Sequence, residues 1–522
     1  MRALRILAAT AVLLGAPPAI GLAQQVGPPT RAERTDFRET SRYEDVVETM
    51  TAVAEGSEAI ALDTLGYSFE GRALPMARWG EGPTRTLVFA NIHAGEVAGK
   101  ESALLLLRDL AGGRHAGWAD RLTVWVAPIY NADGNERIAL TNRPLQHGPI
   151  GGMGIRSNAQ GLDLNRDFTK LEAPESRSLV AFLDAIDPHL VVDLHTTNGT
   201  IHGYDLTYSP PLHPDTDEAI VRFLRDSLLP TVTRAMREEG EWRAYHYGNL
   251  PDFERLEGRR GWYTYDPGPR YSTNYVGLRN RLAILSEAYA YLSFEERIDV
   301  TRRFVEEILD FAARHGERIR EIVDSADRRA VPGEDLAVET EFALVDEDAE
   351  ILLGEVEEES HPYTGEPMLR KREVVRVERM PEYTAFRATA TETAPAAYLV
   401  PSGLEEMAGR LEAHGAGFHR LAEARELDVE VFRIAASSVA ERAYQGHRRR
   451  TLEGSWEEAR RTVPAGTIVV PMDQPLARLA FQLLEPRAPD GFAAWNLLDG
   501  VLEGSSEYPI IRTFKRLPAP AR

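Results

Sequence analysis

TLVFANIHAGEVAGKESALLLLRDL, residues 86–110, joins a short apolar run to a longer stretch with helical spacing. Residues 87–92 are apolar and rich in branched or aromatic side chains, as in a buried strand. From Val97 onward, apolar side chains recur at the spacing of a helix. We therefore predict a strand that leads into a helix, with His93 and Glu96 at the carboxyl end of the strand. That edge of an open α/β sheet is where ligands usually bind.

Three more apolar runs have the composition of buried strands: residues 122–129, 190–194 and 281–286. A side chain that can do chemistry follows each run: Asn131 with Asp133, His195, and Glu287. Because strands of one sheet can end at the same edge, we expect these side chains to gather on one rim with His93 and Glu96.

His93 and Glu96 are spaced so that both side chains can reach one metal ion, through a nitrogen and an oxygen. The pair alone is a weak signal, because 13 histidines and 81 acidic residues give about two such pairs by chance. The alternative is a polar turn in which Glu96 begins the helix. His195, at the end of another strand, supplies a third ligand and favours the metal site.

The composition limits the chemistry and the partners. The 522 residues suggest two domains, and 43% hydrophobic with 27% charged residues is typical of a globular protein. The formal charge of −21 disfavours nucleic acid as a partner. The chain has no cysteine, so it forms no disulfide and has no thiol nucleophile. Any metal must therefore be held by histidine and carboxylate.

Residues 1–23 have the features of a secretory signal. Arg2 and Arg5 precede an apolar run, and Gly21-Leu22-Ala23 resembles a cleavage site. The apolar run is too short for a permanent span, and no later stretch reaches about 18 uninterrupted apolar residues. We expect a soluble periplasmic or secreted protein after cleavage near Ala23, with no permanent membrane span.

The polar motifs together resemble the zinc carboxypeptidase family of the carboxypeptidase A kind, over roughly residues 60–315. The pieces that carry the resemblance are His93-Ala94-Gly95-Glu96, Asn131-Ala132-Asp133-Gly134, Gly161-Leu162-Asp163-Leu164-Asn165-Arg166 and Leu285-Ser286-Glu287. The resemblance implies an α/β fold with a mixed, mostly parallel sheet flanked by helices. It also implies one zinc ion per chain, bound by His93, Glu96 and His195, with a position left open for water.

The same resemblance assigns the remaining roles. Glu287 would be the general base that takes a proton from the attacking water. Asn165 and Arg166 would hold the terminal carboxylate of a peptide, a task that suits a planar guanidinium. Asp163 would orient His93 from behind, or else merely cap a turn.

Two roles have competing candidates. Arg156 is the best match for the arginine that stabilises the oxyanion, but Arg143 competes with it. The family's tyrosine is best matched by Tyr265, which precedes Glu287 by 22 residues. The other candidates are Tyr263, Tyr271 and Tyr275. Ser272 and its neighbours are expected to shape the pocket for the substrate side chain.

The catalytic domain is predicted at residues 41–327, with a linker at 328–333 that contains Pro332-Gly333. Residues 334–522 then form a predicted C-terminal accessory domain of mixed α+β structure, without a constellation of catalytic residues of its own. The leading hypothesis is a metallocarboxypeptidase. A zinc amidase acting on cell-wall peptides or other acyl-amino linkages, and a non-catalytic peptide-binding protein, are the alternatives.

Overall fold

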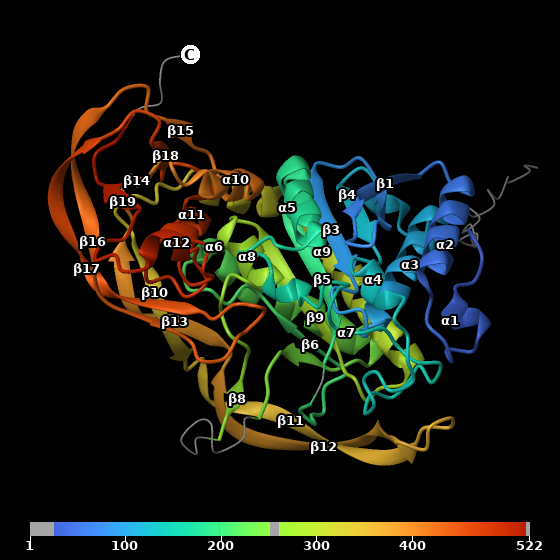
Figure 1. Ribbon diagram of the computed structural model, residues 1–522. Coiled ribbons are helices and arrows are strands. Elements are labelled where there is room, and N and C mark those ends of the chain that lie inside the picture. Colours follow the sequence, from blue (N-terminus) through green and yellow to red (C-terminus); the bar gives the residue numbers. More distant parts are fainter. Residues whose placement is uncertain (1–25, 198, 251–259, 518–522) are drawn as a thin grey trace, which may run out of the picture.

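The computed structural model describes residues 26–197, 199–250 and 260–517 (Figure 1). The predicted signal at residues 1–23 lies outside these ranges. Within them, no helix is both long enough and apolar enough to cross a membrane.

An eight-stranded mixed sheet organises the first part of the chain, in the order β1-β2-β4-β3-β5-β9-β6-β7. The central strands β4, β3, β5 and β9 are parallel to one another, whereas β1, β2 and β6 pair antiparallel to their neighbours on the central side. The strands in chain order are β1 (Ile60–Tyr67), β2 (Ala73–Trp79), β3 (Thr84–Ala90), β4 (Leu122–Ala127), β5 (Leu190–Thr196), β6 (Leu206–Ser209), β7 (Ala244–His246) and β9 (Leu282–Ala288). The predicted α/β class with a mostly parallel centre is confirmed.

Helices cover both faces of this sheet, which explains why the central strands are mostly apolar instead of alternating between apolar and polar residues. Every residue of β5 is buried. Leu194 of β5 faces Gly99, where a Cβ would come within 2.7 Å of the Leu194 Cβ. The preceding residue, Asp193, accepts a hydrogen bond from Ser272. Because adjacent residues of a strand point to opposite faces, the helices that carry Gly99 and Ser272 lie on opposite sides.

The helix with Gly99 is α3 and the helix with Ser272 is α8, and α3 packs against the long helix α9. The helices of this part are α1 (Arg31–Arg34), α2 (Tyr43–Glu55), α3 (Ala98–Ala111), α4 (Ala132–Asn135), α5 (Pro174–Ile186), α6 (Glu218–Phe223), α7 (Leu229–Gly240), α8 (Ser272–Leu278) and α9 (Phe294–Asp327). Short 3-10 turns span Ala116–Trp118 and Leu164–Arg166, and a π-helical turn spans Leu224–Leu228.

The C-terminal part is rich in β-structure, as the predicted α+β region requires. It contains two long ribbons, β11–β12 and β16–β17, and a six-stranded sheet in the order β15-β18-β14-β19-β16-β17. The strands are β10 (Asp335–Ala343), β11 (Asp346–Ser360), β12 (Pro367–Tyr383), β13 (Ala385–Thr393), β14 (Ala397–Val400), β15 (His419–Arg420), β16 (Arg425–Val439), β17 (Arg450–Val463), β18 (Ile468–Pro471) and β19 (Ile511–Thr513). Its helices are α10 (Glu405–Ala413), α11 (Ala477–Leu484) and α12 (Asp499–Leu502).

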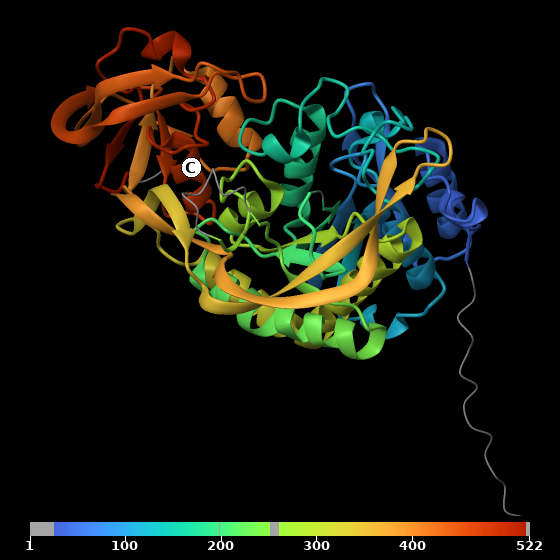
Figure 2. The ribbon, with the colours of Figure 1, turned by 90° about the horizontal axis from the view of Figure 1, so that it is seen from below.

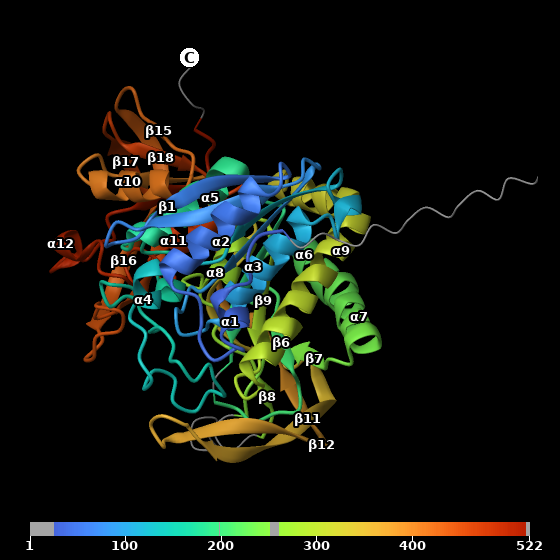
Figure 3. The ribbon, with the colours of Figure 1, turned by 90° about the vertical axis from the view of Figure 1, so that its right-hand side faces the viewer.

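The two parts are in extensive contact. Strand β12 pairs in parallel with the short strand β8 (Trp262–Tyr263). The β11–β12 ribbon extends beneath β6 and β9 in Figures 1 and 3, and Figure 2 shows it crossing the lower face of the molecule. Gly203 donates a backbone hydrogen bond to Leu352 at 2.7 Å, and the buried Lys371 pairs with Asp205. The proposed boundary between residues 327 and 334 remains a prediction.

Candidate active site

The turn between β3 and α3 places His93 and Glu96. Asn91 adopts a left-handed φ of 67°, which asparagine tolerates better than most residues, so the chain bends sharply out of β3. The Glu96 N–H donates to the His93 carbonyl at 2.8 Å and closes the turn. His195 and Glu287 are the next-to-last residues of β5 and β9, and they are direct partners in the ladder. The predicted strand-end positions therefore meet at one edge of the sheet.

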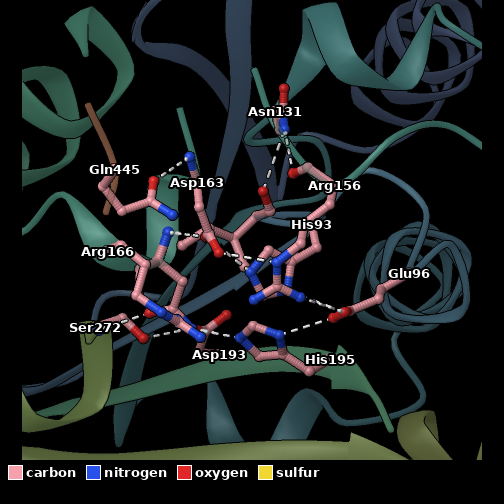
Figure 4. Close-up of polar contacts among 12 residues, drawn as sticks. His93, Glu96, Asn131, Arg156, Asp163, Arg166, Asp193, His195, Ser272 and Gln445 are labelled. Atoms are coloured by element: carbon pink, nitrogen blue, oxygen red, sulfur yellow. Dashed lines mark hydrogen bonds and ion pairs between the residues drawn. The ribbon is translucent and has the colours of Figure 1, made fainter. Parts of the chain in front are cut away.

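His93, Glu96 and His195 are buried and form one cluster, shown in Figure 4. Glu96 Oε1 lies 2.9 Å from His93 Nδ1, and Glu96 Oε2 lies 2.8 Å from His195 Nδ1. One potential ligand atom from each residue lies within 4.8 Å of the others. The three residues predicted to bind the metal are thus brought together.

A carboxylate stands behind each imidazole. His93 Nε2 lies 3.1 Å from Asp163 Oδ1, and His195 Nε2 lies 2.9 Å from Asp193 Oδ2. Such partners fix the ring orientation and the tautomer, which leaves each Nδ1 free to bind a metal. Asp193 was not among the predicted residues, although its position two residues before His195, on the same face of β5, could have suggested it.

The charges of this cluster fit a bound cation. Burial raises the pKa of Glu96, but His93, Arg143 and His195 lower it by more, so it lies well below its ordinary value. Burial lowers the pKa of His195, but Asp193 and Glu96 raise it by more, so it lies well above its ordinary value. The carboxylates of Glu96 and Asp193 therefore stabilise positive charge at the position that the Nδ1 atoms of the two histidines face. Two imidazoles and one carboxylate, without thiolate, are a donor set that suits catalytic zinc.

Glu287 lies beside the cluster and lines the same cavity, which has a volume of about 120 Å³. Its Oε2 atom has no hydrogen-bond partner among the residues that the structure describes. Burial raises the pKa of Glu287 to about 8, with Glu96 adding to the rise and His195 opposing it. A carboxylate with a raised pKa and an unused oxygen is suited to proton transfer.

The two candidate arginines occupy different places. Arg156 lines the cavity, and its Nε donates to Asp163 Oδ2 at 2.8 Å. Asn131 supports this segment by donating to the Arg156 carbonyl at 3.3 Å. Arg143 does not line the cavity; its NH2 lies 2.6 Å from Glu96 Oε1. Of the two, Arg156 is the one that can meet a ligand in the cavity.

The prediction that Asn131 and Asp133 lie on the rim of the site is corrected, because neither residue lines the cavity. The Asp133 carboxylate accepts hydrogen bonds from Ser68 at 2.7 Å and from Arg72 at 2.6 Å. The turn after β4 continues into helix α4, which carries Asp133 away from the cluster while Asn131 stays next to Arg156.

Asn165 and Arg166 line the cavity on the short turn that follows Asp163. The Asn165 N–H donates to Asp163 Oδ1 at 3.0 Å, so the residue behind His93 also shapes this turn. The Asn165 Oδ1 accepts from the Ser272 N–H at 2.8 Å. Ser272 itself does not line the cavity, but its neighbours Tyr271 and Thr273 do, so the expectation that Ser272 and its neighbours shape the side-chain pocket stays a prediction.

Of the four candidate tyrosines, Tyr265 and Tyr271 line the cavity. Tyr263 stacks on Tyr383 with ring centroids 4.5 Å apart, and the Tyr275 hydroxyl lies 2.8 Å from His414 Nδ1. Thr196 and Tyr247 also line the cavity and were not predicted, whereas Thr273 is a neighbour of Ser272 and Leu285 belongs to the motif with Glu287. Thr196 follows His195 in β5, which was a usable signal. Tyr247 follows the three-residue strand β7, which is too short to show a pattern.

A buried cluster of two histidines and one carboxylate next to a further carboxylate, at the carboxyl edge of an α/β sheet, is typical of a metallohydrolase. Residues 46–249 match the family model described as zinc carboxypeptidase. This match agrees with the resemblance seen in the sequence over residues 46–249, and the comparisons support a metallocarboxypeptidase.

Individual proteins are similar over longer stretches. Carboxypeptidase 2 of Trichophyton tonsurans is 24% identical over 446 residues, covering 82% of this chain and 76% of that relative. Carboxypeptidase 2 of Trichophyton rubrum is 24% identical over 493 residues, covering 89% and 85%. The metallo-carboxypeptidase from Burkholderia cenocepacia superimposes with a TM-score of 0.39 at 15% identity, over 51% of this chain and 68% of that structure. For the carboxypeptidase A from Helicoverpa armigera, the TM-score is 0.40 at 15% identity, over 54% and 75%.

Proposed function

We propose that this chain is a zinc-dependent carboxypeptidase that releases single residues from the C-terminal ends of peptides. The observation that carries the proposal is that one cavity is lined by the metal-binding set, by Glu287, and by Asn165 with Arg166. Metal binding and proton transfer alone would suit many hydrolases. A guanidinium beside them suits a substrate that ends in a free carboxylate.

The residues divide the reaction among them. His93, Glu96 and His195 would hold a zinc ion, which would supply a Lewis acid and lower the pKa of bound water to about 7. Glu287 takes a proton from the attacking water through its free Oε2 and returns it to the leaving amine. Arg156 stabilises the oxyanion of the scissile carbonyl, where a single donor contributes about 10² to 10³ in rate. Arg166 and Asn165 hold the terminal carboxylate, and Tyr265 lines the cavity as a further substrate-binding residue.

Export of the protein through a cleaved signal is also part of the proposal, as is its division into a catalytic domain at residues 41–327 and an accessory domain at residues 334–522. A signal at residues 1–23 would send the chain to the periplasm or the exterior, where an acidic chain without cysteine needs no redox protection. The N-terminal sequence of the secreted protein should then begin at Gln24. A mature protein that retains Met1 would contradict this part without affecting the proposed reaction.

The decisive experiment is a digest of mixed peptides and muropeptides, followed by mass spectrometry. Purified protein should contain about one zinc per chain, and activity lost to a chelator should return with zinc. Release of single C-terminal residues supports the proposal. Cleavage of internal amides would support the amidase alternative, and absence of turnover in a zinc-loaded protein would support the binding protein.

A further inference from the structure

The tip of the β16–β17 ribbon, residues 440–449, contacts the segment that carries Arg166, which lines the cavity. The Tyr444 hydroxyl accepts a hydrogen bond from Arg166 Nε at 3.0 Å. The Gln445 side chain accepts one from the Asp163 N–H at 3.2 Å, and Figure 4 shows it next to Asp163 and Arg166. His447 Nε2 lies 2.8 Å from Glu172 Oε1. Three residues of the tip therefore contact the segment that carries Asp163 and Arg166.

The tip has a defined conformation. Tyr444 and His447 exchange backbone hydrogen bonds of 2.8 and 3.1 Å across a two-residue turn. Gln445 and Gly446 in that turn have φ values of 52° and 81°, as in the tight turns that suit twisted ribbons. The Tyr444 and His447 rings lie 6.2 and 5.7 Å from the ring of the buried Trp495. The tip is thus fixed against the body of the C-terminal region.

Arg166 is held on three sides by protein groups. Besides the bond to Tyr444, its NH1 donates to the Asn165 carbonyl at 2.6 Å, and its guanidinium lies 4.0 Å from the centre of the Tyr271 ring. A guanidinium has five N–H donors, and these bonds occupy one on Nε and one on NH1. In the part of the chain that the structure describes, these bonds leave the NH2 group and the second N–H of NH1 for a carboxylate in the cavity.

A second contact from the C-terminal region lies next to the ring of Tyr271. Asp490 Oδ2 lies 2.8 Å from Arg270 NH1, and the Arg270 guanidinium lies 4.8 Å from the centre of the Tyr271 ring. Both Arg270 and Asp490 are buried. Tyr271 thus has cationic neighbours in Arg166 and Arg270, and each of these arginines bonds to a residue of the C-terminal region.

We propose that the C-terminal region completes the site for the substrate carboxylate, with Tyr444 as a positioning residue that fixes the guanidinium of Arg166. This inference rests on the proposed function, because it assigns Arg166 to a terminal carboxylate. A long arginine side chain loses rotamer freedom when it binds, and an arginine already held in place loses less. The tip therefore increases selectivity for peptides with a free C-terminal carboxylate without touching the reacting atoms.

The test uses the full-length, zinc-loaded Glu287→Gln protein, so that ligands bind without turnover. Affinities are measured for N-acetylated dipeptides that cover the twenty C-terminal residues, each as the free acid and as the amide. The acid-to-amide affinity ratio of the best-bound dipeptide should fall about 2- to 10-fold when Tyr444→Phe is added, as expected for one hydrogen bond. Affinity for the amide and zinc content should not change.

Tyr363→Phe is the matched control, because the Tyr363 hydroxyl also accepts from an arginine, Arg38 NH2 at 2.8 Å, on the other ribbon. It should leave the ratio unchanged. In the otherwise wild-type enzyme, Tyr444→Phe should raise KM with little change in kcat, since Arg166 binds substrate and transition state alike. On an Arg166→Ala background, Tyr444→Phe should have no further effect on kcat/KM.

The outcomes separate the two proposals. If the parent protein favours acids over amides and Tyr444→Phe leaves the ratio unchanged, the role of the tip is wrong while the proposed function stands. If the parent protein does not favour acids, or binds no dipeptide, the carboxylate site itself is wrong and both proposals fail. A fall in kcat with KM unchanged would also overturn the positioning role.

Discussion

The strand β5 and the ribbon β16–β17 both contribute to the region around the cavity, but they are stabilised in different ways. All seven residues of β5 are buried, and its position is fixed by packing on both faces. Much of β17 is exposed, and its charged side chains pair across the ribbon, as Arg460 does with Glu426 at 3.1 Å. The buried strand carries His195, which is assigned to the metal site, whereas the ribbon is long enough to bring Tyr444 into contact with Arg166.

The largest expected effect tests the buried side of this comparison. Glu287→Gln should lower turnover by at least about 10², because general-base assistance typically contributes 10² to 10⁴. Zinc content should stay near one per chain, since Glu287 is assigned to proton transfer and not to coordination. His195→Ala should instead lose the metal. Near-normal turnover in Glu287→Gln, or loss of zinc from that variant, would show that the two roles are wrongly assigned.

The pH profile provides a second check on Glu287. Its carboxyl must be ionised to accept a proton, so kcat/KM should rise with pH as the group loses its proton. Burial raises the pKa of Glu287 to about 8, and a bound cation nearby lowers it. The acidic limb should therefore lie no higher than about 8. The same limb persisting in the residual activity of Glu287→Gln would assign it to another group.

A second prediction concerns the place where the ribbon β11–β12 meets the sheet domain. Lys371 of β12 is buried and pairs with Asp205. Lys371→Met should destabilise the protein by about 3–5 kcal/mol, because it leaves a buried carboxylate without its cation. Denaturant unfolding measures the loss, and the double variant Lys371→Met with Asp205→Asn should recover part of it. If Lys371→Met is as stable as the parent protein, the ion pair between Lys371 and Asp205 does not stabilise the contact between the two regions.

The buried strands of the sheet were also the elements that the sequence predicted. Residues 87–92, 190–194 and 281–286 are mostly apolar because both faces of their strands are covered. The positions of His93, His195 and Glu287 followed from where those runs end. The irregular segment between β4 and α5 has no such period, so its sequence could not separate Arg143 from Arg156.

Contacts from the ribbon could not be predicted at all. Tyr444 lies 278 residues from Arg166 in the sequence, and the pairing depends on the twist and length of a ribbon whose exposed faces carry little hydrophobic pattern. Tyr247 escaped detection for a related reason, because it follows a strand of only three residues. Local pattern identifies buried elements and their ends, whereas long-range contacts between exposed elements need the three-dimensional structure.

A further prediction compares how a buried carboxylate of the sheet domain and one of the C-terminal region affect zinc affinity. Asp163→Asn should lower zinc affinity about 10- to 100-fold, because a carboxylate behind a metal-binding histidine orients the ring and raises its basicity. The matched control is Asp490→Asn, which removes a buried carboxylate of the C-terminal region that pairs with Arg270. It should leave zinc affinity unchanged. Equal losses in the two variants, measured by competition with a chelator, would show a general effect of removing buried charge.

The smallest effect is expected on the exposed part of a ribbon. Arg379 of β12 lies 2.6 Å from Asp348 and also pairs with Glu350 of β11, yet its side chain remains 57% exposed. Water and salt screen such pairs, and ordering long side chains opposes the attraction. Arg379→Ala should therefore leave the denaturation midpoint unchanged within error, at low and at high salt. Because Lys371 lies on the same strand, the two variants differ mainly in burial. If Arg379→Ala clearly loses stability at low salt but not at high salt, exposed ion pairs also stabilise this ribbon. The ribbon and the buried strands would then differ only in how much such contacts contribute to stability.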